Sequence, residues 1–394
     1  MHGTIRTSYT HTIYASYVGY ITQAVVNNFA PLLFLTFAGE YGLTLDQITL
    51  ITTVNFLVQL CVDLLSAKWI DRIGCRAGIM AAHVLAGAGL IGMAALPRIS
   101  GNAYAGLMAA VVLYAMGGGI IEVLISPIVE ACPTEKKEAA MSLLHSFYCW
   151  GHVAVVLAST AFFALFGVEN WRILACLWAV IPILNIFYFS QVPIYPVVSE
   201  QEKLPVRRLL GRKTFWLIAI LMVCAGASEQ AMSQWTSAFA ESALGVTKTA
   251  GDMAGPCAFA LLMGTARALY GKFSDRVPLK KAMMGSAVLC MGCYGLVVFA
   301  GSPVLGLLGC AMCGFSVGIF WPGTFSLAAR ELPSGGTAMY ALLALAGDLG
   351  CSSGPTVVGF AASAMDGRLK AGLLAASAFP LLMLLGILRI RGRK

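Results

Sequence analysis

Charged residues are scarce in this sequence. They make up 11% of its 394 residues, against about 25% in average soluble chains. Hydrophobic residues reach 59%, and the mean hydropathy is +0.81. This composition excludes an ordinary soluble domain and indicates a chain that crosses a membrane many times.

Signals for processing, catalysis and metal binding are also scarce. The first residues lack the basic, apolar and cleavage-site pattern of a leader peptide, so we expect nothing to be removed. No nucleophile elbow, phosphate-binding loop or metal cluster occurs in the sequence, so we expect neither an enzyme nor a cofactor. The pairs Cys290-x-x-Cys293 and Cys310-x-x-Cys313 have a metal-like spacing. Because they lie in apolar runs without nearby histidines, we interpret them as small packing residues.

Apolar runs long enough to cross a bilayer, about 20 residues each, recur twelve times. They predict an all-α polytopic membrane protein with twelve transmembrane helices, at 10–38, 47–70, 77–97, 103–129, 139–167, 170–190, 214–241, 250–273, 281–300, 304–329, 336–364 and 370–389. A basic segment with three prolines divides six spans from six. The predicted organisation is an N-terminal six-helix bundle over 1–190, a cytoplasmic linker over 191–213 and a C-terminal six-helix bundle over 214–394.

The lysines and arginines are distributed unevenly between the two sides of the membrane. If the N-terminus is cytoplasmic, the segments on that side carry twenty of the 26 basic residues and the opposite loops carry five. This asymmetry obeys the positive-inside rule, so we expect both termini in the cytoplasm and the chain in the cell inner membrane. The net charge of +8 is then mostly membrane-surface charge. Lipid is therefore the expected surrounding, nucleic acid is not an expected partner, and we expect a monomer.

The two halves of the chain resemble each other. Asp71-Arg72 follows the second span, and Asp275-Arg276 follows the eighth, 204 residues later. A weaker echo of glycine and proline positions relates the fourth span to the tenth. Parallel repeats of this kind predict two pseudo-symmetric six-helix bundles, with a substrate site between them near the bilayer midplane.

Carboxylates at membrane depth are the first candidates for function. Glu122 lies inside the fourth span, five residues before Pro127. Inserting a charged carboxylate there costs at least roughly 2.5 kcal/mol, so such a group normally faces a cavity or a partner and marks a transport or proton pathway. Asp348 and Glu229 lie in the eleventh and seventh spans. Because a low dielectric favours the protonated form of a carboxylate, we predict that these three carry proton coupling. Structural pairing is the alternative for each, and Glu229 is also a candidate acceptor for a substrate hydrogen bond.

Asp63 and Arg267 occupy equivalent positions with opposite charges. Each stands eight residues before the Asp-Arg pair of its own repeat. An arginine at that depth needs a carboxylate partner, and the sequence offers Asp63, Glu122 and Asp348 without ranking them. We predict a gating or ion-pair role for Asp63 and Arg267, with substrate contact as the alternative.

Amides and indoles inside the spans are candidates for recognising a polar solute. Sugar sites usually combine hydrogen-bonding amides or carboxylates with an aromatic face. Gln23 and Asn27 are one turn apart in the first span, Gln234 and Trp235 are adjacent in the seventh, and Trp321 lies in the tenth. We predict that these five residues bind substrate, while core or interface packing remains open for each tryptophan.

Two further polar sets leave alternatives open. Asn55, Gln59 and Asp63 share one helical face at spacing four, so we expect that stripe to line a cavity. His145 and His152 are seven residues apart on one face of the fifth span. Imidazole titrates near neutral pH, so these histidines either respond to pH or pack as neutral side chains.

The loop after the second span, Asp71-Arg72-x-Gly74-x-Arg76, resembles the signature of the major facilitator superfamily at that place. Ala67 replaces the leading glycine of the signature, and Cys75 replaces a basic residue. With the twelve spans and the repeat, this resemblance implies the superfamily fold over the whole chain. Charged groups at a cytoplasmic helix end interact with neighbouring helix termini. We therefore predict a latch role, with a solvated turn as the alternative, for Asp71, Arg72, Arg76, Asp275 and Arg276.

Four further passages resemble the fucose-permease-like sugar:proton symporters of that superfamily. They are Gly117-x-Gly119-x-x-Glu122 with Pro127, Leu144-His145-Ser146-Phe147-Tyr148, Phe320-Trp321-Pro322 and Ala346-Gly347-Asp348-Leu349-Gly350. This resemblance implies that Glu122 takes the place of the proton-coupling carboxylate. Asn28 stands where the family has an aspartate that helps to couple sugar to proton, and His145 stands where it tends to have glutamine. We include Asn28 and His145 in the predicted substrate site.

The resemblance and the residues together predict a secondary active transporter. We expect two bundles to rock about a central cavity by alternating access, with a proton as the coupling ion for uptake of a small polar solute, a sugar in the first place. Proton-driven efflux of amphipathic compounds is the runner-up, which the aromatic and methionine-rich spans permit. A non-transporting membrane sensor is less expected, because we see no appended soluble domain.

Overall fold

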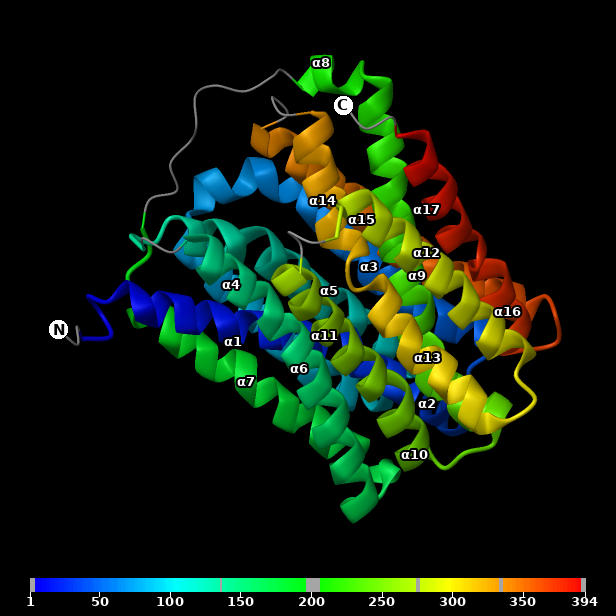
Figure 1. The fold of residues 1–394 in the computed structure, drawn as a ribbon. Coiled ribbons are helices and arrows are strands. Elements are labelled where there is room, and N and C mark those ends of the chain that lie inside the picture. The colour runs from blue at the N-terminus through cyan, green and yellow to red at the C-terminus, as the bar shows by residue number, and fades with distance from the viewer. Residues whose placement is uncertain (1–3, 135–136, 196–205, 274–276, 333–335, 391–394) are drawn as a thin grey trace. The chain divides into compact units, whose positions relative to one another are not determined.

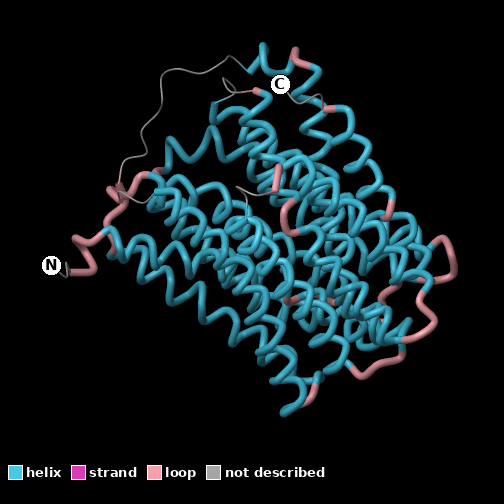
Figure 2. Tube along the Cα trace, in the orientation of Figure 1, coloured by secondary structure: helices cyan, strands magenta, loops and turns pink. Residues whose placement is uncertain are grey.

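The computed structural model of the chain describes residues 4–134, 137–195, 206–273, 277–332 and 336–390. Helices joined by loops make up this part of the chain, and no strand occurs in it (Figure 2). Ten helical segments within it are long and apolar enough to cross a membrane. The two other predicted spans coincide with α15 (Gly336–Ser363) and with the helical residues 248–273. The predicted all-α polytopic fold is confirmed.

The chain divides into two compact units. The first comprises residues 1–47 and 54–199, and the second comprises residues 48–53 and 200–394. The division after Ser199 falls inside the segment 191–213 that the sequence predicts as a linker. Because residues 196–205 lie outside the described ranges, the predicted boundaries at 190 and 214 stay predictions.

The first unit is a helical bundle whose elements appear in blue to green in Figure 1. In chain order they are α1 (Tyr9–Asn28), η1 (Ala30–Leu33), α2 (Phe34–Tyr41), α3 (Leu45–Ile73), α4 (Cys75–Ile99), α5 (Ala103–Glu130), α6 (Lys137–Phe166), η2 (Val168–Asn170) and α7 (Trp171–Gln191). Helix α1 packs on α5, α6 and α7, and α4 packs on α5 and α7. Ile121 and Ile125 of α5 are fully buried in this core, so the residues between them are fixed close to α1.

The second unit is built around one buried helix. Its elements are α8 (Val206–Leu210), α9 (Lys213–Leu244), α10 (Lys248–Asp252), η3 (Met253–Cys257), α11 (Ala258–Phe273), α12 (Leu279–Phe299), α13 (Pro303–Val317), α14 (Phe320–Glu331), α15, α16 (Leu369–Ala376) and α17 (Ala378–Arg389). Helix α9 packs on α13, α14, α15 and α17, and its side chains from 224 to 240 are all buried. A helix that is covered all round can hold polar side chains away from lipid.

Four predicted spans are interrupted helices rather than single ones. A 3₁₀ turn containing Pro31 separates α1 from α2, and the π turn η3 contains Pro256. The tenth span breaks at Gly318, and the twelfth breaks at Ser377. Proline lacks a backbone N–H and bends or ends a helix, and π turns inside helices often occur at functional sites. Hydropathy alone treats each of these spans as continuous.

Candidate functional site

Glu122 of α5 contacts an amide from α1. Gln23, whose side chain is 3% exposed, donates a hydrogen bond from Nε2 to Oε2 of Glu122 at 2.5 Å. The other amide atom of this glutamine, Oε1, is buried and has no hydrogen-bond partner among the described residues. The sequence-predicted proton carrier and a sequence-predicted substrate residue are therefore in direct contact, and an acceptor beside them is unfilled.

A second set of amides continues this contact by one turn of α1. The Oδ1 atom of Asn27 accepts hydrogen bonds from Asn55 Nδ2 at 3.2 Å and from Gln59 Nε2 at 2.8 Å, both on α3. Asn55 Oδ1 is buried without a hydrogen-bond partner in the described part of the chain. Asn55 and Gln59, the first two members of the predicted stripe, therefore face α1. Asp63, the third, is half-buried one turn further along α3.

Tyr148 of α6 closes the group. Its hydroxyl oxygen lies 3.5 Å from Asn27 Nδ2 and 3.4 Å from Asn28 Nδ2, each of which donates to it. Asn28 Nδ2 also donates to the carbonyl of Ala24 at 2.9 Å, which anchors this amide to its own helix. We call the whole group the amide cluster; it comprises Gln23, Asn27, Asn28, Asn55, Gln59, Glu122 and Tyr148.

His145 lies beside this cluster but is placed differently. Its side chain is exposed in the first unit, and its ring centroid is 5.4 Å from that of Tyr20. The hydroxyl of Tyr20 hydrogen-bonds Ser126 at 3.1 Å, one turn along α5 from Glu122. His152, by contrast, is 3% exposed. Shared position on one helical face therefore does not give the two histidines the same surroundings.

In the second unit, Glu229 and Arg267 form an ion pair. Oε2 of Glu229 lies 3.6 Å from Nη2 of Arg267, with side chains 12% and 28% exposed respectively. From the sequence, we predict Asp63, Glu122 or Asp348 as the partner of this arginine, and Glu229 is not among these candidates. The spacing along the chain gave no signal for it, because α9 and α11 are neighbours only in the folded unit.

The remaining predicted site residues of the second unit differ in their burial and in their hydrogen bonds. Gln234 Nε2 donates to Gln230 Oε1 at 3.1 Å on α9. Trp235 is 1% exposed and donates its indole N–H to the carbonyl of Pro355 at 3.0 Å. Trp321 is half-buried. Asp348 is 6% exposed.

Arg76, a member of the predicted latch, binds the end of α7. Its guanidinium donates to the carbonyls of Phe189, Ser190 and Val192 at 2.6, 3.0 and 2.8 Å. These carbonyls have no intrahelical partner at a helix C-terminus. The side chains of Asp71 and Arg72, and the whole of Asp275 and Arg276, lie outside the described residues, so their latch role stays a prediction.

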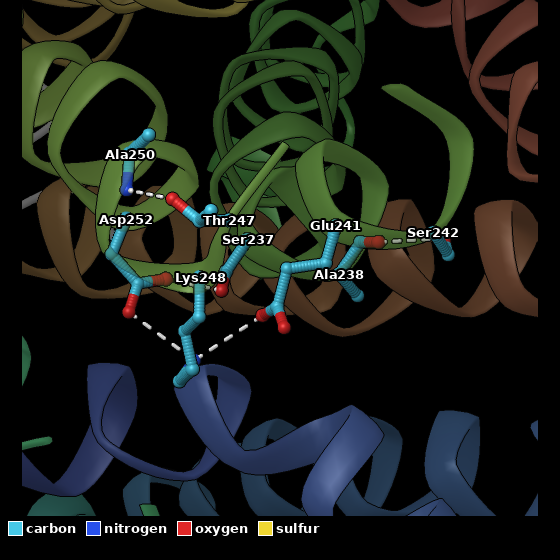
Figure 3. Close-up of polar contacts among 8 residues, drawn as sticks. All are labelled: Ser237, Ala238, Glu241, Ser242, Thr247, Lys248, Ala250 and Asp252. Atoms are coloured by element: carbon cyan, nitrogen blue, oxygen red, sulfur yellow. Dashed lines mark hydrogen bonds and ion pairs between the residues drawn. The ribbon is translucent and has the colours of Figure 1, made fainter. Parts of the chain in front are cut away.

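A charged cluster that the sequence did not predict lies where α9 meets α10 (Figure 3). Lys248 Nζ lies 3.3 Å from Glu241 Oε1 and 3.2 Å from Asp252 Oδ2. Asp252 is fully buried and also accepts a hydrogen bond from the Ser237 hydroxyl. One ammonium group is therefore shared by two carboxylates. The spacing of four between Lys248 and Asp252 was the available signal.

A neutral polar cluster joins three helices of the first unit. His83 Nδ1 lies 2.7 Å from the carbonyl of Ile79, and its Nε2 lies 2.8 Å from Asn185 Nδ2. Asn185 Nδ2 also donates to the carbonyl of Ala15 at 3.0 Å. A carbonyl can only accept, so Nδ1 carries the proton and Nε2 accepts from the amide. These hydrogen bonds hold α1, α4 and α7 together within the first unit.

The two Cys-x-x-Cys pairs meet on adjacent helices. The sulfur atoms of Cys290 on α12 and Cys313 on α13 are 3.9 Å apart, and both residues are fully buried. Among the described residues, no group of three or more histidine, cysteine, aspartate or glutamate side chains could hold a metal ion.

Solved structures with the same fold are transporters. The chain is similar to a D-xylose-proton symporter with a TM-score of 0.77 at 13% identity, covering 98% of this chain and 99% of that one. For a bacterial homologue of the human lysosomal transporter Spinster the values are 0.75, 13%, 98% and 96%. For the E. coli fucose:proton symporter they are 0.65, 16%, 98% and 100%. At these identities the similarity shows the fold, and no curated protein matches the sequence.

The sequence itself gives the family. The profile of the Major Facilitator Superfamily matches residues 16–355, so this chain belongs to that superfamily. It is therefore a polytopic membrane transporter rather than an enzyme. The family and the symporter-like fold agree with the resemblance found in the sequence.

Proposed function

We propose that this protein is a proton-coupled symporter for a small, hydroxyl-rich solute such as a sugar. The amide cluster is the observation that carries the proposal. It brings five neutral amides and a tyrosine hydroxyl to a single membrane-depth carboxylate, and two buried amide oxygens, Gln23 Oε1 and Asn55 Oδ1, have no hydrogen-bond partner among the described residues. Solute hydroxyls are donors of the kind that these acceptors lack, and each hydroxyl can accept as well.

Glu122 supplies the coupling step in this proposal. Ionised, it accepts the hydrogen bond of Gln23 Nε2; protonated, its carboxyl group gains an O–H donor and holds that amide less strongly. Gln23 can then donate to a solute hydroxyl while its Oε1 accepts from another. Proton binding and solute binding are linked because they use the same amide, and such linkage between two ligands is reciprocal.

The other predicted residues complete the proposal. Asp348 and Glu229 are second candidates for proton transfer, and His145, Gln234, Trp235 and Trp321 are further candidates for solute contact. Asp63 and Arg267 are proposed to gate the pathway. We also propose uptake into the cytoplasm across the cell inner membrane, with both termini on the cytoplasmic side, as the distribution of basic residues predicts. Fold analogy to the xylose and fucose symporters supports a sugar only weakly, so the amide cluster carries that choice.

The deciding experiment compares Glu122→Gln with the unchanged protein in proteoliposomes. Radiolabelled D-xylose and L-fucose serve as probes, with and without a pH gradient. The unchanged protein should accumulate a probe against its gradient, whereas Glu122→Gln should lose accumulation and keep solute counterflow. Glu169→Gln, at an exposed position of η2, is the matched control. Accumulation that survives in Glu122→Gln would refute the coupling role.

Proton-driven efflux of an amphipathic compound is the second candidate. The Spinster homologue matches 98% of this chain, as the sugar symporters do, so the fold leaves the solute open. A thermal-shift panel of monosaccharides, nucleosides, organic acids and cationic dyes on the purified protein separates the two. Stabilisation by dyes alone, together with pH-driven dye export from cells that make the protein, would replace the sugar proposal.

A further inference from the structure

At the break in the tenth span, a side chain from another helix supplies a hydrogen bond that the helix itself cannot make. Helix α13 ends at Val317 and α14 begins at Phe320. In a continuous helix, the carbonyl of Gly318 would accept from the N–H of residue 322. That residue is Pro322, which has no N–H. Arg267 Nε of α11 instead donates to this carbonyl at 3.1 Å.

The same guanidinium reaches a carboxylate in the opposite direction. Its Nη2 lies 3.6 Å from Oε2 of Glu229 on α9. A guanidinium is planar and presents its donors in a fixed fork, so Nε and Nη2 cannot move independently. The position of the Gly318 carbonyl is therefore tied to the attraction between Arg267 and Glu229.

The break is closely packed against α11, so it can shift little unless Arg267 shifts with it. A Cβ atom on Gly318 would lie 2.9 Å from both the Cβ of Ala266 and the carbonyl oxygen of Met263, so the backbone of α11 touches the break directly. On the far side of the break, the indole of Trp321 fills the space where a Cβ atom of Gly347 would stand. A shift of the break should therefore move Trp321, whose indole packs on Gly347.

We propose that Arg267 is a positioning residue that transmits the charge state of Glu229 to the break in the tenth span and so to Trp321. Neutralising Glu229, by a proton or by a bound solute group, removes this ionic attraction, while the hydrogen bond to the Gly318 carbonyl and the contact of Nη2 with Met263 Sδ at 3.8 Å remain. The first turn of α14 then moves relative to Gly347. The biological role of this coupling rests on the proposed transport function, whereas the coupling of Glu229, Arg267 and Trp321 does not depend on it.

Other ionisable groups lie on the helices around Glu229 and could also affect Trp321. The described helices that pack on α9 carry further charged side chains, namely Arg207, Arg208, Lys248, Asp252, Arg330, Glu331, Asp348, Lys370 and Arg389. Tyr294 of α12 contacts α9 through a hydrogen bond, which its hydroxyl donates to the carbonyl of Ser228 at 2.9 Å. Asp348 is the one that adjoins Gly347, so an Asp348→Asn background shows whether the effect comes from Glu229.

The test reads the fluorescence of Trp321 in the full-length purified protein without solute. The Trp321 component is the difference between the protein and its Trp321→Phe variant. Glu229→Gln and Arg267→Gln should each shift this component, and the double variant should shift it no further than Arg267→Gln alone. Arg267→Lys should resemble Arg267→Gln, because one ammonium does not reproduce the fork. Arg330→Gln, at an exposed position of α14, should leave the component unchanged.

Pro322→Ala provides a second and independent arm. Alanine restores the N–H that the Gly318 carbonyl lacks, so Arg267→Gln should shift the Trp321 component less in that background. Additive shifts in the double variant, or a Glu229→Gln variant without any shift, would overturn the proposal. If Arg267→Gln does not fold, Arg267→Lys replaces it in every comparison. Failure of proton-driven uptake in the unchanged protein would refute the proposed function and leave these results standing.

Discussion

Arg76 and Lys280, 204 residues apart, each bind the C-terminus of the last helix in their own unit. Arg76 donates to three carbonyls at the end of α7, and Lys280 Nζ donates to the carbonyl of Ile390 at 2.6 Å, directly after α17. The separation equals that of the two Asp-Arg pairs. The two halves of the chain therefore share this contact as well as the helix pattern, although an arginine makes it in the first half and a lysine in the second.

Removing these cations should destabilise the two units unequally. Arg76→Gln should lower the free energy of unfolding by about 2 kcal/mol, and Lys280→Gln by about 1 kcal/mol, because hydrogen bonds from charged donors contribute roughly this much and Arg76 makes more of them. Denaturant titration of the purified protein measures both. Arg98→Gln, at an exposed position in the last turn of α4, should have little effect. Equal losses at 76 and 280 would contradict the contact-based ranking.

Asn27 and Asn55 should be energetically coupled. Asn27→Ala leaves the buried amide donors of Asn55 and Gln59 without their acceptor, which should cost about 2 kcal/mol of stability. Asn55→Ala removes one of those donors, so the double variant should lose less than the sum of the single losses. A double-mutant cycle on unfolding free energies measures this coupling. A coupling energy of zero would mean that the two amides do not share a hydrogen bond.

Lys248 should be needed mainly because Asp252 is buried. Lys248→Met leaves a fully buried carboxylate without its counter-ion, which should cost about 3 kcal/mol. Asp252→Asn in the Lys248→Met background removes that charge and should recover a large part of the loss. Thermal unfolding of the single and double variants measures the recovery. Glu241→Gln should recover less in the same background, because Glu241 is 22% exposed and water can solvate it.

His83 should be held as the tautomer with the proton on Nδ1. The carbonyl of Ile79 accepts from Nδ1, and the amide of Asn185 donates to Nε2. Nitrogen chemical shifts of labelled histidine measure the tautomer directly. Asn185→Leu should remove the partner of Nε2 and lower stability by about 1–2 kcal/mol, with His83→Phe giving a similar loss. An Nε2–H signal for His83 would show that the Asn185 amide is turned the other way.

The limits of the spans could be predicted from the sequence because they depend on one physical variable, the length of the apolar run. Burial in lipid requires about 20 apolar residues in a row, and every predicted span matches a helix or an interrupted helix within a few residues. Gln23, Asn27 and Glu122 were readable as well. A polar side chain inside an apolar run is expensive unless it has a partner, so its presence alone marks a site.

Pairings between helices were much less readable. Arg267 was assigned three possible partners, and the ion pair with Glu229 was missed, because spacing along one helix gives no rotation of another helix about its axis. Asp252 was passed over because it stands near a span end, where a charge looks solvated. The helix breaks at Pro31 and Pro256 were also missed, since hydropathy averages over a window wider than one turn.

The fit of Trp321 against Gly347 has a consequence for how this chain can diverge. Any side chain at 347 would enter the volume that the indole occupies, so a substitution at 347 requires the indole of Trp321 to shift or to be replaced by a smaller side chain. In related chains the two positions are expected to vary as a pair, a bulky residue at one accompanying a small residue at the other. An alignment of homologues in which large residues occur freely at both places would show that their ancestors packed these helices differently.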